Sequence, residues 1–131
     1  MIPVNSIEVN FDRLRWETLK EVYVNDRQTE IYFITKDGTK FLMTHEQECC
    51  EHVWVEEIIG DLGVLINSEI LKAEVATNRD LDKLDSDDDS FIWTFYTLAT
   101  IKGYVTFRWY GESNGCYSET VKLYYCGKDN A

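Results

Sequence analysis

Four residues in one short stretch carry the strongest chemical signal in the sequence. His45, Cys49, Cys50 and His52 lie within eight residues of one another, and they include both histidines and two of the four cysteines of the chain. Imidazole nitrogen and thiolate sulfur are the ligands that suit zinc. We therefore expect a structural zinc ion bound by these four side chains.

The spacing His-x3-Cys-Cys-x-His leaves the ligand set open, because it matches no standard zinc finger. Neighbouring residues of an extended strand point to opposite faces, so the four side chains converge only if the segment forms a turn or loop. A ligand from elsewhere in the chain is the alternative. After His52, the candidates in order are Asp61, Glu51, Cys116 and Cys126. Without a metal, the same residues would be two buried thiols beside two exposed histidines.

Signatures of catalysis are weak in this chain. The sequence has no H-E-x-x-H motif, and it has no glycine-rich phosphate loop. Glu46, Glu48 and Glu51 lie near enough to the cluster to act as the general base of a small metallohydrolase, which is the enzymatic alternative. We expect the protein not to be an enzyme.

The net charge of −11 limits the classes of partner. Such a charge repels nucleic acid and anionic lipid and attracts basic protein surfaces. No apolar run is long enough to span a membrane, and residues 1–5 lack the pattern of a signal peptide. We therefore expect a cytoplasmic protein with reduced cysteines, no membrane association and no direct binding of nucleic acid.

An acidic segment at residues 78–90 adds to this picture. It contains six aspartates and few apolar residues, which predicts a flexible, solvated loop. The run from Asp85 resembles a calcium loop only superficially, because Ser90 replaces the required glycine and Tyr96 the bidentate glutamate. Its functional interpretation is a phosphate mimic presented to a basic partner.

Alternation of apolar and polar residues predicts a chain of short strands, and an aromatic content of 14% favours them further. We expect strands over residues 18–24, 29–35, 40–44, 53–59, 69–77, 91–100, 104–110 and 118–125, with a weaker one within 1–10. Turns are expected at 25–28, at 102–103 and at 111–115. Asp37-Gly38 between two apolar runs is a strong hairpin signal.

Two short helical elements complete the prediction. Residues 11–16 are expected to form one helical turn with Leu14 and Trp16 facing the core, and residues 60–66 a short helix or turn. Strict alternation in 18–24 places Leu19 on the opposite side from Val22. The expected fold is a single mainly β (α+β) domain over residues 1–131, with an antiparallel sheet folded into a sandwich or partial barrel.

Three stretches carry a resemblance to known families. They are T-H-E-Q-E-C-C-E at 44–51, I-I-G-D-L at 58–62, and the run from W-T-F-Y-T-L to G-C-Y-S-E at 93–119. With these, the chain from about residue 18 to 123 resembles an uncharacterised family of small proteins encoded by phages and prophages, which carries only a domain-of-unknown-function label. That resemblance implies no established chemistry.

In size, acidity and its His/Cys cluster, the chain also looks like a metal-containing type II anti-CRISPR protein. This second resemblance implies a phage-encoded inhibitor in the bacterial cytoplasm. Its target would be a basic type II CRISPR effector nuclease, whose loading or use of DNA it blocks. It also implies a metal role for His45, Cys49 and Cys50. The alternative is a phage accessory or assembly protein that binds itself or another phage protein.

Overall fold

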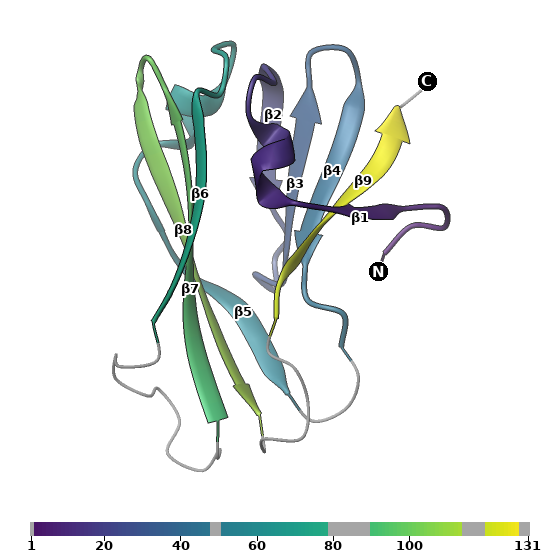
Figure 1. Cartoon of the computed structure of the whole chain (residues 1–131), viewed down its shortest axis with the longest axis vertical. Helices are drawn as coiled ribbons and strands as arrows, with labels where there is room; N and C mark the ends of the chain where they lie inside the picture. The colour runs from purple at the N-terminus through teal and green to yellow at the C-terminus, as the bar shows by residue number, and fades with distance from the viewer. Residues whose placement is uncertain (1, 48–50, 79–89, 114–119, 129–131) are drawn as a thin grey trace.

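The structure, a computed structural model, describes residues 2–47, 51–78, 90–113 and 120–128. Within these ranges, nine strands form two antiparallel sheets, and two short 3-10 helices lie between strands. Figure 1 shows the sheets edge on, as two facing layers. Two facing antiparallel sheets are a β-sandwich, which confirms the predicted mainly β fold class.

The larger sheet has five strands in the order β1-β9-β4-β3-β2. They are β1 (Ile7–Val9), β2 (Leu19–Val24), β3 (Glu30–Thr35), β4 (Thr39–Thr44) and β9 (Lys122–Lys128). The β3–β4 hairpin closes at the predicted turn, where Gly38 has a φ of +90° and donates its N–H to the carbonyl of Thr35 at 3.0 Å. β9 lies inside this sheet, between β1 and β4.

The smaller sheet has four strands in the order β5-β8-β7-β6. They are β5 (His52–Ile59), β6 (Lys72–Asn78), β7 (Ser90–Thr100) and β8 (Gly103–Ser113). β7 and β8 form a long hairpin with Thr100 opposite Gly103, across the two-residue turn Ile101–Lys102. β8 is therefore a central strand, paired with β5 on one side and β7 on the other.

The two helical elements appear where the sequence predicts them, as η1 (Phe11–Leu14) and η2 (Leu62–Leu65). η1 packs on the smaller sheet through Phe11, whose ring lies 5.0 Å from that of Tyr96 in an edge-to-face arrangement. Leu14 and Leu65 are fully buried. Neither helix is long and apolar enough to cross a bilayer, nor is any other in the described part of the chain.

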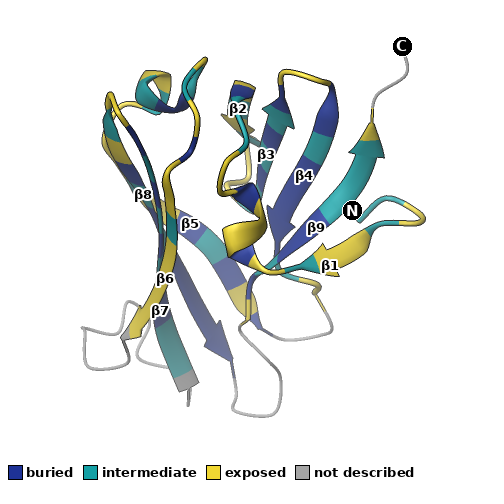
Figure 2. Cartoon of the chain, turned by 45° about the horizontal axis from the view of Figure 1, so that its top comes forward, coloured by how far each residue is buried: buried dark blue, intermediate teal, exposed yellow. Residues whose placement is uncertain are grey.

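The hydrophobic core lies between the two sheets, as the dark ribbon segments of Figure 2 indicate. Phe33 of β3 meets Phe107 of β8 there, with ring centroids 5.8 Å apart and ring planes at 88°. Trp109 of β8 is 1% exposed. Burying an aromatic side chain of this size contributes about 1.5–3 kcal/mol to stability, so these rings are central to the cohesion of the two layers.

Two predictions of side-chain direction are wrong. Trp16 is 58% exposed, because its backbone turns into the left-handed region (φ +77°) as its N–H donates to the carbonyl of Ile70 at 2.7 Å. In β2, the register shifts between Leu19 and Glu21, which is a β-bulge. The bulge breaks the alternation, so Leu19 and Val22 both pack into the core.

Two predicted boundaries also differ from the structure. β8 continues to Ser113, through the turn predicted at 111–115, because Gly111 and Glu112 pair with both β5 and β7. β9 begins at Lys122 rather than at 118. The acidic loop predicted at 78–90 falls mostly outside the described residues, since only its end residues, which close β6 and open β7, belong to them.

Candidate functional site at one end of the sandwich

Six strand ends meet at one end of the sandwich, which we call the His45 end. It is formed by Thr44, His52, Asn78, Ser90, Ser113 and Lys122. The registers bring them together, with Thr44 opposite Lys122 in one sheet, and His52 opposite Glu112 and Ser90 opposite Ser113 in the other. This end is at the bottom of Figure 1.

His45 follows β4 directly and joins the two sheets at this end. Its Nδ1 lies 2.7 Å from the carbonyl oxygen of Thr120, just before β9. A carbonyl oxygen only accepts, so Nδ1 carries a proton and donates it in this bond. That leaves Nε2 to face Glu51 of the opposite sheet, with 3.8 Å between Nε2 and Oε1.

Both members of this pair are buried, since the side chain of His45 is 6% exposed and that of Glu51 is 0% exposed. Glu51 precedes β5 and alternates with the inward-facing Val53 and Val55, which places its carboxylate on the core side of the strand. Its carbonyl accepts a hydrogen bond of 2.7 Å from the side chain of Gln47. The Nε2 atom of His45 has no hydrogen-bond partner among the residues that the structure describes.

Of the predicted metal ligands, the structure places His45 in this buried pair and His52 elsewhere. His52 is exposed and lies opposite Glu112, one residue after Glu51 and therefore on the other face of β5. Cys49 and Cys50 lie outside the described residues. Of the alternative ligands that lie within the described residues, Glu51 is the one that approaches His45.

Two of the remaining alternatives, Asp61 and Cys126, are not beside His45. Asp61 caps η2, where its carboxylate accepts a hydrogen bond from the N–H of Gly63 at 2.8 Å. Cys126 lies four residues beyond Lys122 along β9 and contacts the hydroxyl of Ser6 at 3.4 Å. Cys116 is outside the described residues. Within residues 2–47, 51–78, 90–113 and 120–128, no three His, Cys, Asp or Glu side chains come close enough to hold a metal ion.

A cavity of about 280 Å³ opens next to His45, and its polar lining includes Arg27, Glu30 and Gln47. Glu30 accepts a hydrogen bond from the hydroxyl of Tyr32 at 3.0 Å. Burial first, and then this bond to the carboxylate, raise the pKa of Tyr32 to about 12. Tyr32 therefore stays protonated at neutral pH and acts as a donor that orients Glu30 toward the cavity.

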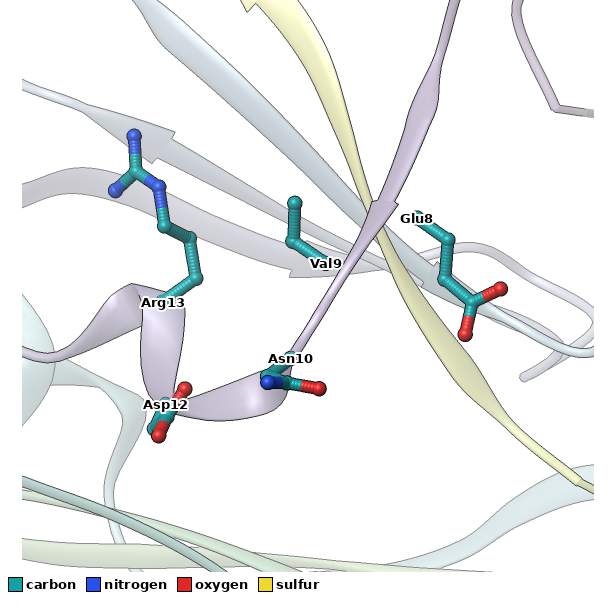
Figure 3. A pocket seen from close by; sticks show the side chains of 5 residues that line it. All are labelled: Glu8, Val9, Asn10, Asp12 and Arg13. Atoms are coloured by element: carbon teal, nitrogen blue, oxygen red, sulfur yellow. The ribbon is translucent and has the colours of Figure 1, made fainter.

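A second hollow, of about 340 Å³, lies between β1 and η1. Figure 3 shows its five lining side chains pointing in different directions from the chain. Glu8 pairs with Lys122 at 3.4 Å, and Arg13 with Glu17 at 3.1 Å. Because these charges are paired with neighbours and do not converge, the hollow has the character of an ordinary surface depression.

An aromatic cluster on the outer face of the smaller sheet surrounds Arg108, a residue that the sequence did not single out. Tyr110 is 0% exposed and Trp93 4% exposed, although both lie outside the central core. The guanidinium of Arg108 stacks 4.6 Å from the Trp93 ring and pairs with Glu57 of β5. The sequence predicted aromatic strands here. The role of Arg108 depends on the pairing of β5 with β8, for which the sequence holds no local signal.

Comparison with known proteins gives a family and nothing further. A family model described as a domain of unknown function, DUF7448, matches residues 7–123. That range includes every strand from β1 to β8 and the start of β9. No curated protein and no solved structure matches the chain.

Proposed function

The chain belongs to the DUF7448 family, whose description assigns no activity, and we propose that it is a non-catalytic domain that binds a basic protein through its His45 end. The observation that carries this proposal is the position of the strand ends that flank three segments. Residues 48–50, 79–89 and 114–119 each begin and end at described residues of the His45 end.

These three segments account for much of the excess negative charge. They contain eight acidic residues and two basic ones, within a chain whose net charge is −11. The described residues on both sides of each segment lie at one end of the sandwich, and we assign the charge of the segments to that end. A cationic surface is the complement of such a pole, and association should be fast and sensitive to salt.

The experiment compares two variants with the same change in net charge. One replaces Asp87, Asp88 and Asp89 by asparagine. The other neutralises Asp12, Glu21 and Glu69, which are exposed elsewhere on the sandwich. The first should weaken binding to a basic partner by about tenfold or more, and the second by much less. Equal losses in the two variants would contradict a site at the His45 end.

The specific partner in this proposal is a type II CRISPR effector nuclease, which the resemblance to anti-CRISPR proteins supplies. The inhibitor would occupy the positively charged nucleic-acid channel of the nuclease and block its loading or use of DNA. A gel-shift assay with purified nuclease, guide RNA and target DNA measures this directly. Loss of DNA binding on adding the protein, relieved as salt rises, is the expected result. DNA binding that is unaffected at a tenfold excess of the protein would rule this partner out.

A structural zinc ion belongs to the same proposal, with His45, Cys49, Cys50 and Glu51 as its ligands. Two ligands of tetrahedral zinc lie about 3.3 Å apart at bond lengths of about 2.0–2.1 Å, so the 3.8 Å between His45 and Glu51 needs only a small adjustment. Zinc here would tie the end of β4 to the start of β5, and thus one sheet to the other.

Elemental analysis of the purified protein tests the zinc. We expect one zinc ion per chain, lost in His45→Ala and in Glu51→Gln and retained in His52→Ala, and we expect chelation to lower the melting temperature. Protein without zinc after purification in zinc-containing buffer would show that the buried pair acts without a metal.

The cavity beside His45 favours a second candidate, a small metallohydrolase. A hydrolase needs an open coordination position for water and a base near it, and a cavity of about 280 Å³ supplies room for a small substrate. Zinc-loaded protein would then hydrolyse model esters at a rate that neutralising a neighbouring base, in Glu46→Gln or Glu48→Gln, lowers while the zinc is retained. If protein fully loaded with zinc shows no turnover, the zinc has only a structural role.

A further inference from the structure

The two sheets have four edge strands, and three of them are protected against pairing with another chain. β1 has only three residues. β2 carries a bulge between Leu19 and Glu21, and the carbonyl of Leu19 already accepts from the N–H of Asn67 at 2.8 Å. Short strands, bulges and a covered backbone prevent the edge of a sheet from pairing with another chain.

β5, one edge of the smaller sheet, combines several of these devices. Its register shifts between Val55 and Glu57, and Glu56 and Glu57 add two exposed charges. The backbone of Val55 is also covered by the β2–β3 turn. Its N–H donates to the carbonyl of Gln28 at 2.7 Å, and its carbonyl accepts from the Gln28 side chain at 3.1 Å. This edge is closed to a further strand.

β6, the other edge of the smaller sheet, carries the exposed charges of Lys72 and Glu74, but it has no bulge and no backbone hydrogen bond from a covering segment among the described residues. Its seven residues pair with β7 in an unbroken register. Outside that ladder, its residues make no backbone hydrogen bond within the described part of the chain. Figure 2 shows β6 at the front of the molecule and mostly exposed. Val75 within it is 49% exposed, and Leu71 just before it is 37% exposed.

The hairpin register identifies which backbone groups of β6 point outward. Thr100 and Gly103 flank a two-residue turn, so they form a hydrogen-bonded pair, and alternate residues of β7 bond to β8 from there. The other residues of β7, which include Ala99 and Thr97, therefore bond to β6, where they lie opposite Lys72 and Glu74. The N–H and C=O groups of Ala73, midway between them, point to the open edge.

We propose that β6 pairs antiparallel with β6 of a second copy of this chain, about a two-fold axis at Ala73. In that register Lys72 lies directly opposite Glu74 of the other copy. A two-fold axis repeats each contact, so two attractive charge pairs form together. The eight strands of the two smaller sheets become one continuous sheet.

The charges along β6 favour a second copy of β6 as the partner, and they favour this register. An axis at Glu74 would place two carboxylates opposite each other, and an axis at Val75 would place Lys72 and Glu74 opposite the uncharged Asn78 and Ala76. The axis at Ala73 alone makes the edge complementary to itself in charge. The two side chains already form an ion pair at 3.3 Å within one chain, so they share one face of the sheet.

Space beside the strand is consistent with a second copy. A hollow of about 420 Å³ lies between η1 and the start of β6, lined by Asp12, Arg15 and the residues from Leu71 to Glu74. Both members of the charged pair, Lys72 and Glu74, and Ala73 between them line this hollow. It therefore leaves room along the edge of β6 for the strand of a second copy.

A charge swap tests the proposal by measuring the dissociation constant of the dimer in sedimentation experiments at about 0.15 M salt. Glu74→Lys places lysine opposite lysine and should raise that constant by about tenfold or more. The double variant Lys72→Glu with Glu74→Lys restores complementarity and should return it to within about threefold of the original. Glu74→Lys also lowers the net negative charge of each copy, so a general relief of repulsion would act in the opposite direction.

Cross-linking tests the register. Opposite Cα atoms of a hydrogen-bonded pair lie about 5.5 Å apart, which suits a disulfide. Ala73→Cys should therefore give a covalent dimer on mild oxidation. Val75→Cys, on the same edge and face, would lie about 14 Å from its counterpart and should not. The original chain serves as the control, because it reports any cross-linking through its own four cysteines. A chain that is monomeric up to about 1 mM, a double swap that fails to restore association, or cross-linking through Val75→Cys instead would each overturn the proposal.

Discussion

Asp37, an exposed residue in the β3–β4 turn, holds the turn through several hydrogen bonds. Its Oδ1 accepts from the hydroxyl of Thr35, from the hydroxyl of Thr39 at 2.8 Å and from the N–H of Thr39 at 3.1 Å. These bonds, led by the one from Thr35, lower the pKa of Asp37 well below its ordinary range, and Lys128 at 3.6 Å adds to the effect.

Asp37→Asn should therefore lower the melting temperature at pH 7. A carboxyl group whose pKa is lowered in the folded state stabilises the protein above its unfolded pKa of about 3.9, and this stabilisation is lost as the pH falls toward the folded pKa. The difference between the original chain and the variant should thus shrink steadily below about pH 4. Melting curves over pH 2–7 measure it, with Asp26→Asn in the β2–β3 turn as the control. A gap in melting temperature that is independent of pH would contradict this role.

The two histidines differ in burial, which gives a matched pair of variants. His45→Ala leaves the buried Glu51 without its imidazole neighbour, and removing one partner of a buried pair costs about 3 kcal/mol. His52→Ala changes an exposed side chain and should cost less than about 0.5 kcal/mol. Urea unfolding in the presence of a chelator measures both free energies without a contribution from metal. Similar costs for the two would argue against the pair.

At this scale the sequence identified part of the candidate site. The concentration of ligand types pointed to His45, and Glu51 was among the alternatives. That Glu51 rather than His52 faces His45 depends on the phase of alternation at the start of β5, which no local pattern in the sequence sets. Arg108 was missed because its partners, Trp93 and Glu57, are distant in the chain.

Strand pairings between segments that are adjacent in sequence could be predicted from the sequence. Pairings between segments that are far apart in sequence could not. The Asp37-Gly38 turn and the short β7–β8 connection determine their own hairpins. The pairings of β5 with β8 and of β1 with β9 join segments far apart in sequence, so no local pattern encodes them. The bulge in β2 likewise reflects a tertiary demand, the burial of Leu19.

Gly60, at the end of β5, allows a close approach that a side chain would prevent. Its φ is +110°, and a Cβ there would lie 2.7 Å from the carbonyl oxygen of Tyr104. Gly127 also has a positive φ, of +84°, but it has open space around it. Gly60→Ala should cost about 3 kcal/mol, and Gly127→Ala about 1 kcal/mol, which reflects backbone strain alone. Chemical unfolding of the two variants gives the comparison, and equal costs would mean that the contact with Tyr104 relaxes freely.

On the scale of the whole molecule, two layers are held together by contacts between side chains of different sheets. Phe33 and Phe107 provide the clearest of these, as an edge-to-face pair across the core. A double-mutant cycle with Phe33→Leu and Phe107→Leu should give a coupling energy of about 0.5–1.5 kcal/mol. The pair Phe33→Leu and Tyr104→Leu is the control, because Tyr104 is 62% exposed and should show no coupling. Additive effects of Phe33→Leu and Phe107→Leu would contradict the observed packing of the layers.

The position of β9 between β1 and β4 has a consequence for biosynthesis. Until residues 122–128 have left the ribosome, β4 lacks one of its two neighbours, and the apolar run Phe41-Leu42-Met43 borders an incomplete sheet. The nascent chain can form the β3–β4 and β7–β8 hairpins early, but the larger sheet is complete only when β9 pairs with β4 and β1. Translation stalled before residues 122–128 emerge would leave an intermediate that exposes apolar residues and is sensitive to proteases.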